Sequence, residues 1–221
     1  MAYTLIGSLI SPFARKVAVV LSEKGLAYEL DDVNPFAPPA DFASVSPLGK
    51  IPVLRDGDRV VNDSTVICRY LERRQPQPPL YPADPYDCAR AEWLEEYIDG
   101  GFQPVAAAKV FFPLVLAPLL GRDGIGDDEA AAVAASEFPP FFDYLSAELG
   151  ESEFLVGESL TVADVTVASL FVNLRLSGVA PDGDRWPGLR SYVSRMHARE
   201  SFRAVISPVV DLIGQRWIEL D

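Results

Sequence analysis

The chain has 221 residues, of which 49% are hydrophobic and 23% charged, a composition typical of folded globular proteins. The formal net charge of −13 argues against nucleic acid as a partner, because phosphate binding requires clustered lysine and arginine. No uninterrupted apolar run approaches the ~18 residues of a membrane span, and residues 1–7 lack the features of a signal peptide. Two cysteines and one histidine are too few for a disulfide scaffold, a zinc centre or a Ser-His-Asp triad. We therefore expect a reducing, cytoplasmic location, no metal and no membrane partner.

Charge and proline content divide the chain. Residues 1–80 carry nine basic and nine acidic side chains, whereas residues 81–221 carry ten basic and 23 acidic ones. Five prolines fall between Gln75 and Tyr86, and proline removes backbone donors and stops helices. The predicted organisation is a first domain at 1–76, a stiff proline-rich linker at 77–86 and a second domain at 87–221.

Strand and helix signals alternate before the linker. Ser11 suits a helix N-cap and Pro12 the first helical position. Asp56-Gly57, between two β-rich runs, predicts a hairpin turn. The expected elements are strand 3–7, helix 11–25, strand 27–33, an ambiguous segment at 35–45, strands 51–54 and 59–61, and helix 64–74.

After the linker the pattern predicts only helices. Pro104, Pro113 and Pro118 should bend or break the first of them, and Pro139-Pro140 should distort the second. The expected helices cover residues 87–120, 127–149, 160–177, 189–198 and 201–213. The fold class is therefore an α/β domain followed by an all-α domain.

Two segments of the first domain have both a structural and a chemical interpretation. Ser11 is a helix cap, and it also places a hydroxyl beside a helix N-terminus, where free N–H groups favour an anion. Pro52, at the start of a strand, indicates either an edge strand or a cis proline. A cis proline would turn the backbone of Ile51 towards a peptide-like ligand.

A third segment, Asn62-Asp63-Ser64-Thr65, also has two interpretations. Asp63 or Ser64 could cap the following helix. Alternatively, the helix start binds a carboxylate while Asp63 receives a neighbouring amino group. Each segment alone is a weak signal, but the three occur in order within one α/β domain.

With these segments in view, the sequence resembles the cytosolic glutathione transferase superfamily over nearly its whole length. Ser11-Pro12-Phe13-Ala14 resembles the Cys-Pro-Phe-Ala pattern of omega-like members, with serine in place of cysteine. Pro47 to Pro52 is similar to the family's Pro-x-Gly-Lys-Ile-Pro pattern, and Asp63-Ser64 stands where the family has Glu-Ser. The resemblance implies a thioredoxin-like first domain, a homodimer and a detoxification role with glutathione as co-substrate.

The resemblance also implies roles for individual residues. By position, Ser11 contacts the glutathione sulfur, with Ser8 as the next candidate. The residues expected to bind glutathione are Phe13, Lys50, Ile51, Asp63 and Ser64. A glutathione thiol resembles cysteine, with a pKa of roughly 8.5. The Ser11 hydroxyl and the helix N-terminus would favour the thiolate, so no general base is needed.

An apolar electrophile would sit between the domains. The aromatic candidates for its pocket are Phe13, Tyr97, Phe102, Phe111 and Phe112, although most aromatics on long helices are core or dimer contacts. Trp93, Trp217 and Cys68 are expected to pack rather than react. His197, between Arg195 and Arg199, is expected on a solvated face.

Thr161-Val162-Ala163-Asp164 forms a helix capping box. The resemblance marks this motif as a folding element of the family, and we assign it to stability rather than to chemistry.

Other functions stay open beside transfer to an electrophile. A glutathione-dependent reductase normally needs a cysteine for the mixed disulfide, and position 11 is serine. An isomerase or dehalogenase would use the same activated thiolate. A non-catalytic glutathione-binding protein of the same fold is the third alternative.

Overall fold

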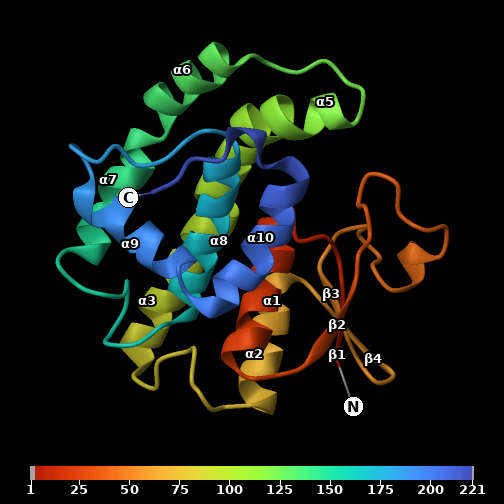
Figure 1. Cartoon of the computed structure of the whole chain (residues 1–221). Coiled ribbons are helices and arrows are strands. Elements are labelled where there is room, and N and C mark those ends of the chain that lie inside the picture. Colours follow the sequence, from red (N-terminus) through yellow and green to blue (C-terminus); the bar gives the residue numbers. More distant parts are fainter. Residues whose placement is uncertain (1–2, 221) are drawn as a thin grey trace.

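The computed structural model describes residues 3–220, and Figure 1 shows a small sheet beside a larger group of helices. The sheet is mixed, with strand order β2-β1-β3-β4. Its strands are β1 (Tyr3–Ile6), β2 (Tyr28–Asp31), β3 (Val53–Asp56) and β4 (Arg59–Asn62). β1 is parallel to β2, and β3 is antiparallel to both β1 and β4. Pro52 therefore precedes an interior strand and not an edge strand.

The register of the sheet brings three distant segments to one edge. Val53, the first residue of β3, lies opposite Ile6 at the end of β1 and opposite Asn62 at the end of β4. The turns that follow β1 and β4 and the turn that precedes β3 consequently leave the sheet on the same side. These turns contain the three segments that the sequence singles out.

Two helices cover the sheet in the first domain. α1 (Pro12–Glu23) and α2 (Ser64–Arg74) begin where the sequence predicts. The ambiguous segment forms only a short 3₁₀ turn, Phe42–Ser44, anchored by the buried ring of Phe42.

One long helical segment opens the second domain, and prolines change its winding without ending it. It runs from α3 (Pro85–Glu96) through α4 (Gln103–Ala106) to α5 (Ala117–Leu119). π-helical stretches, Tyr97–Phe102 and Ala107–Leu116, join these pieces. The wider π register shifts the backbone pairing, so prolines that lack an N–H are accommodated and the predicted break does not occur.

This long helix also corrects the expectation that no segment has the length and apolar composition of a membrane span. By length and composition alone, Pro85–Leu119 is apolar enough to cross a membrane, and 39% of its most apolar window is buried. Within the segment, Val110 and Leu114 pack into the hydrophobic core while Leu119 is exposed. A count of uninterrupted apolar residues misses such a helix because single polar residues divide it.

The remaining helices surround a central one. They are α6 (Asp127–Glu137), α7 (Pro139–Leu149), α8 (Val162–Leu176), α9 (Pro187–His197) and α10 (Glu200–Ile213). The predicted distortion at Pro139-Pro140 is a helix boundary, between α6 and α7. Every residue of α8 is buried, and α1 of the first domain packs directly against it (Figure 1). One hydrophobic core therefore spans both halves of the chain.

His197 is buried, so its predicted place on a solvated face is wrong. Its Nε2 lies 2.8 Å from the carbonyl oxygen of Ala168, and its Nδ1 lies 2.8 Å from the Arg175 guanidinium. Burial lowers the pKa of His197 to about 3, which keeps the ring neutral at physiological pH. The flanking arginines misled the prediction because residues two apart on a helix face different directions.

Candidate functional site

Ser11 is the N-cap of α1, as the sequence predicts. Its Oγ accepts a hydrogen bond from the backbone N–H of Ala14 at 3.5 Å, and its side chain is half-buried. Because the hydroxyl acts as an acceptor in this contact, its own hydrogen is left to donate to a ligand atom. Phe13 follows in the first turn and is also half-buried. The first turn of α1 thus combines a hydroxyl, a helix N-terminus and an aromatic ring.

Gly7 allows this helix start to approach the turn before β3. A Cβ atom at Gly7 would lie 3.3 Å from the Cβ atoms of both Ala14 and Ile51. Its φ of +155° is also unfavourable for other residues. The sequence prediction missed this role of Gly7 in packing, although a glycine between a strand and a helix cap was a signal for it.

The Ile51–Pro52 peptide bond is cis, as one of the two interpretations requires. The preceding loop is closed by buried Ser46, whose Oγ donates to the Lys50 carbonyl at 2.6 Å and accepts from the Lys50 N–H at 2.9 Å. Within residues 3–220, the backbone N–H and C=O of Ile51 have no hydrogen-bond partner. They are therefore available to a ligand with an extended backbone. The Lys50 side chain is exposed nearby.

Asp63 caps α2, and this cap limits the backbone N–H groups that a ligand carboxylate could use at the helix start. Its Oδ1 accepts hydrogen bonds from the N–H groups of Thr65 at 3.0 Å and Val66 at 3.1 Å. The structure therefore has the cap that one of the two interpretations requires, and this cap occupies both N–H groups. The N–H and hydroxyl of buried Ser64 are what remains for an anion. Asp63 has a φ of +74°, which aspartate tolerates better than most residues.

A buried ionic cluster, which the sequence analysis missed, ties the start of α2 to the second domain. Lys16 Nζ lies 2.7 Å from Glu95 Oε1 and 2.7 Å from Asp99 Oδ2. The Thr65 hydroxyl donates to Glu95 at 2.9 Å. Burial raises the pKa of Asp99, although Lys16 partly offsets the effect. The cluster fixes Thr65, the residue after Ser64. It also places the carboxylate of Asp99 in the same region as that of Asp63.

The aromatic candidates separate into different environments. Phe102 and Phe111 are buried in the core, whereas Tyr97 packs in an aromatic group with Trp93 and Tyr144. Phe112 instead meets Phe36 of the first domain, with ring centroids 5.8 Å apart.

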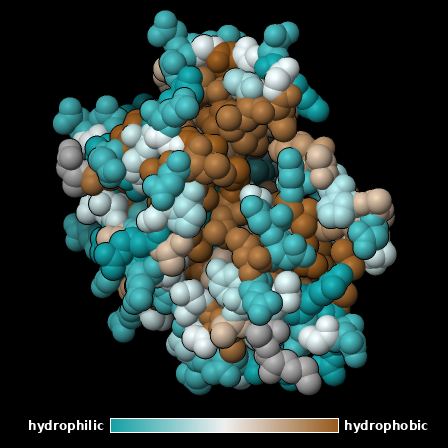
Figure 2. Space-filling model, turned by 45° about the vertical axis from the view of Figure 1, so that its right-hand side comes forward, coloured by the Kyte–Doolittle hydropathy of each residue, from teal (hydrophilic) through white to brown (hydrophobic). Residues whose placement is uncertain are grey.

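Phe36 lies in the loop after β2, and Phe112 lies on the π-helical stretch Ala107–Leu116. Figure 2 shows a band of hydrophobic surface with a hollow in it, on the face that comes forward from the right of Figure 1. Phe112 is the predicted aromatic that the structure places between the two domains.

One further residue, Cys68, and one motif, the Thr161–Asp164 capping box, are found as the sequence predicts. Cys68 is buried, and burial raises the pKa of its thiol. The Thr161–Asp164 capping box is present at the start of α8. Neither residue group lies at the sheet edge that carries Ser11. Within residues 3–220, no group of three or more metal-ligating side chains is close enough to hold a metal ion.

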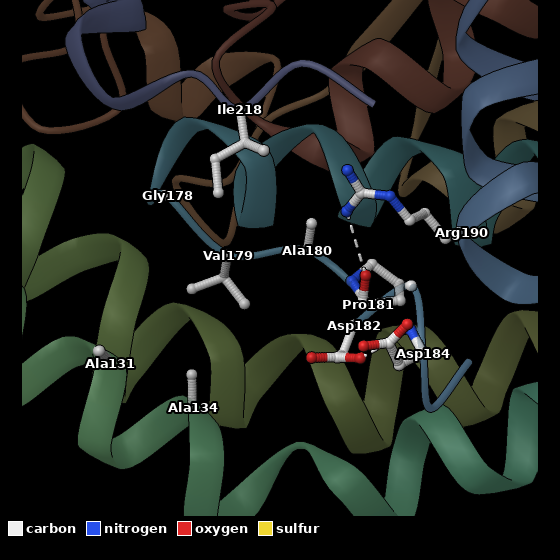
Figure 3. Close-up of a pocket in the computed structure, with 11 residues that line it drawn as sticks. Ala131, Ala134, Gly178, Val179, Ala180, Pro181, Asp182, Asp184, Arg190 and Ile218 are labelled. Atoms are coloured by element: carbon white, nitrogen blue, oxygen red, sulfur yellow. Dashed lines mark hydrogen bonds between the residues drawn. The ribbon is translucent and has the colours of Figure 1, made fainter. Parts of the chain in front are cut away.

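A separate pocket of about 590 Å³ lies in the helical half of the molecule. Figure 3 shows it between α6, the loop after α8 and the C-terminal tail at Ile218. Asp182, Asp184 and Arg190 supply its charged groups. None of the predicted site residues lines this pocket.

Comparisons with known proteins agree with this architecture. Residues 5–79 match the glutathione S-transferase N-terminal domain family, and residues 124–207 match the C-terminal domain family. Glutathione S-transferase 3 of Zea mays is 35% identical over 173 residues, covering 75% of each chain. A stringent starvation protein A homolog of Pasteurella multocida is 27% identical over 199 residues, covering 90% of this chain and 87% of the relative.

A solved structure is similar as well. The Methylobacterium radiotolerans glutathione S-transferase, in complex with glutathione sulfonate, has a TM-score of 0.76 and 29% identity, covering 93% of this chain and 95% of that one. An α/β domain with a mixed four-stranded sheet, followed by a helical domain, is the architecture of glutathione S-transferases. The chain belongs to this family.

Proposed function

We propose that the protein is a glutathione transferase that stabilises the glutathione thiolate for attack on an apolar electrophile. One observation carries the proposal: the sheet register gathers the Ser11 hydroxyl, the unpaired backbone of Ile51 and the Asp63–Ser64 helix start at one edge. These groups match the sulfur, the peptide backbone and the γ-glutamyl end of glutathione. The glutathione sulfonate complex of a relative supports the choice of ligand.

The proposed mechanism needs only groups that this chain supplies. The Ser11 O–H donates a hydrogen bond to the sulfur, and the N-terminus of α1 adds a favourable dipole. Both interactions favour the thiolate, whose proton leaves to solvent. The sulfur lone pair then forms a bond to the electrophilic carbon, and the leaving group departs with its bonding electrons. Ser11 stays uncharged and forms no covalent bond.

The contact between Phe36 and Phe112 supports an apolar electrophile. The two rings join the first and second domains, so an apolar ligand bound beside them would contact both domains. We also propose a cytoplasmic location and a homodimer. For the dimer, the exposed apolar residues Val66 on α2 and Trp93 on α3 are the proposed contacts.

A non-catalytic role is the second candidate, because a relative aligned over 90% of this chain carries the name stringent starvation protein A homolog. In that case the site would bind glutathione without turnover, or bind nothing. Reductase chemistry is disfavoured by the serine at position 11, whereas isomerase or dehalogenase chemistry would use the same thiolate.

The proposal is tested by following conjugate formation between glutathione and 1-chloro-2,4-dinitrobenzene by mass spectrometry and absorbance. The wild type should form the conjugate faster than the solution reaction. Ser11→Ala should bind glutathione yet turn over at least tenfold more slowly, because it keeps the site but lacks the hydroxyl. Its fold should persist, since the cap contact of 3.5 Å is long.

Two outcomes would contradict parts of this proposal. Full turnover in Ser11→Ala would make Ser11 only a cap and shift attention to Ser8. Glutathione binding without any conjugation, by the wild type and with several electrophiles, would favour the non-catalytic role. Ser11→Cys is an additional probe, and a mixed disulfide with glutathione would be visible as added mass.

A further inference from the structure

Arg15 is an unusual buried cation. Its side chain is fully buried one turn into α1, and it makes no ion pair with any carboxylate in residues 3–220. The other fully buried cations contrast with it. Lys16 pairs with Glu95 and Asp99, and Lys24 pairs with Glu72.

Neutral groups alone hold the Arg15 guanidinium. One nitrogen donates to the Leu9 carbonyl at 2.6 Å, and another donates to the Ser169 carbonyl at 2.9 Å and to Asn173 Oδ1. Its buried Nε has no hydrogen-bond partner within residues 3–220. A charge kept in the core with an unsatisfied donor and no counter-ion is costly, so a functional reason for it is expected.

The contacts of Arg15 point to the loop that carries Ser11. Leu9 precedes Ser11 by two residues, a chain length of at most about 7 Å. Asn173 reinforces the same loop, because its Nδ2 donates to the Ile10 carbonyl at 3.2 Å. α8 of the second domain therefore fixes both the guanidinium and the loop.

Within residues 3–220, the charged groups around Arg15 are bonded to other partners. Lys16 of α1 pairs with both Glu95 and Asp99, a cluster with one carboxylate more than it has cations, and Glu23 pairs with Arg199 near α10. On α8, the carboxylate of Asp164 accepts hydrogen bonds from Leu155, Thr161 and Tyr192. The guanidinium of Arg175 contacts His197, whose ring is neutral. The other charged groups of α9 are Arg190 and Arg195, both cations. Burial lowers the pKa of Arg15 to about 9, so its guanidinium is still cationic at neutral pH.

We propose that Arg15 is an electrostatic residue of the sulfur site, whose positive charge, paired with no carboxylate, favours the thiolate of glutathione bound at Ser11. This inference rests on the proposed function and adds a residue to its site. Arg15 does not touch the sulfur. It acts at a distance through a dry interior, where a charge is screened less than in water.

The expected magnitude is measurable. A unit charge about 10 Å from the sulfur, at an effective dielectric constant near 20, shifts the thiol pKa by about 1. The readout is the thiolate absorbance of enzyme-bound glutathione as a function of pH. It is measured for the wild type, Arg15→Met, Arg15→Lys, Asn173→Asp and Asn173→Ala.

These variants distinguish an effect of the Arg15 charge on the thiol pKa from an effect of changed side-chain shape. Arg15→Met should raise the pKa of the bound thiol by about 1, and Arg15→Lys should restore most of the difference. Asn173→Asp keeps Arg15 in place but adds a neutralising carboxylate, so it should raise the pKa similarly. Both variants lose the contact from Nδ2 to Ile10, and Asn173→Ala, the uncharged control, also loses the contact to Arg15. Asn173→Ala should therefore raise the thiol pKa by clearly less than Asn173→Asp does.

An unchanged thiol pKa in Asn173→Asp would overturn the inference, even if Arg15→Met fails to fold. An equal rise in Asn173→Ala and Asn173→Asp would also overturn it, because the effect would then be geometric. Failure of the proposed function has a different signature: the wild type itself would bind no glutathione or would not lower its thiol pKa. The inference about Arg15 would fall with it.

Discussion

At the residue scale, Asp63 combines a structural contact with a proposed binding role. One carboxylate oxygen caps α2 through Thr65 and Val66, and the other oxygen makes no hydrogen bond within residues 3–220. The cap fixes the carboxylate at the helix start. The proposed ligand ammonium would then meet a preoriented anion. Substitutions can separate these two roles because asparagine caps helices about as well as aspartate.

Asp63→Asn should weaken glutathione binding about tenfold while leaving the free energy of unfolding nearly unchanged. The substitution removes the charge-assisted contact between the carboxylate and the ligand ammonium, which is worth roughly 1.5–3 kcal/mol when well formed. Asp63→Ala should lose the cap as well, at about 1 kcal/mol of stability. Calorimetric titration and denaturant unfolding measure the two effects.

The control for Asp63 is a glutathione analogue without the α-amino group. It should bind the wild type and Asp63→Asn equally, because it never used the contact. Comparing both ligands on both proteins forms a double-mutant cycle. Equal losses for the two ligands would mean that Asp63 acts only through the helix start.

At the scale of elements, Asp164 ties the start of α8 to its surroundings through four hydrogen bonds. Asp164 is buried and accepts hydrogen bonds from the N–H and hydroxyl of Thr161, the N–H of Leu155 and the hydroxyl of Tyr192. A capping box accounts for the contacts to Thr161 only. The contacts to Leu155 and Tyr192 connect α8 to the preceding loop and to α9, so Asp164 is a structural centre of the helical domain.

Thr161→Ala and Asp164→Ala should therefore differ in their cost. The first removes one cap partner, at about 1 kcal/mol. The second leaves the buried Tyr192 hydroxyl and Leu155 N–H without their acceptor, at about 1–3 kcal/mol each. Urea unfolding measures both. Neither variant should change glutathione affinity, and a selective loss of affinity with unchanged stability would contradict the structural assignment.

Local signals in the sequence predicted most elements, because they depend on neighbouring residues. The Ser11-Pro12 cap, the Asp56-Gly57 turn and the capping box all act within four residues. The π-helical winding near Pro113 was not predictable, because it depends on packing against other helices. The ionic partners of Lys16 lie about 80 positions away in the chain, so no local pattern indicated them.

At the scale of the whole molecule, the site is built by both halves of the chain. Asn173 of α8 holds the loop before Ser11, and Asp99 and Glu95 hold Lys16 beside the start of α2. A further tie joins the C-terminal end of α1 to α10, where Glu23 accepts hydrogen bonds from Arg199 and Ser201. The sequence indicated the site residues of the first domain but not these supports from the second.

The proposed dimer is a prediction about the assembled molecule. Val66 on α2 is 52% exposed and Trp93 on α3 is 50% exposed. Burial of such apolar surface would favour self-association. Trp93→Glu and Val66→Glu should each convert a dimer into a monomer, as measured by light scattering. Leu212→Glu on α10, a control at a residue that is 70% exposed, should not. A monomeric wild type would contradict the proposal.

The central claim is that this site ionises glutathione, and a spectrophotometric titration of the bound thiol tests it most directly. Free glutathione has a thiol pKa near that of cysteine, roughly 8.5. Bound to the wild type, the thiol should ionise about 2 pH units lower, equivalent to ~2.7 kcal/mol of thiolate stabilisation. Bound to Ser11→Ala, it should ionise closer to the free value. Binding with an unchanged thiol pKa in the wild type would contradict the claim.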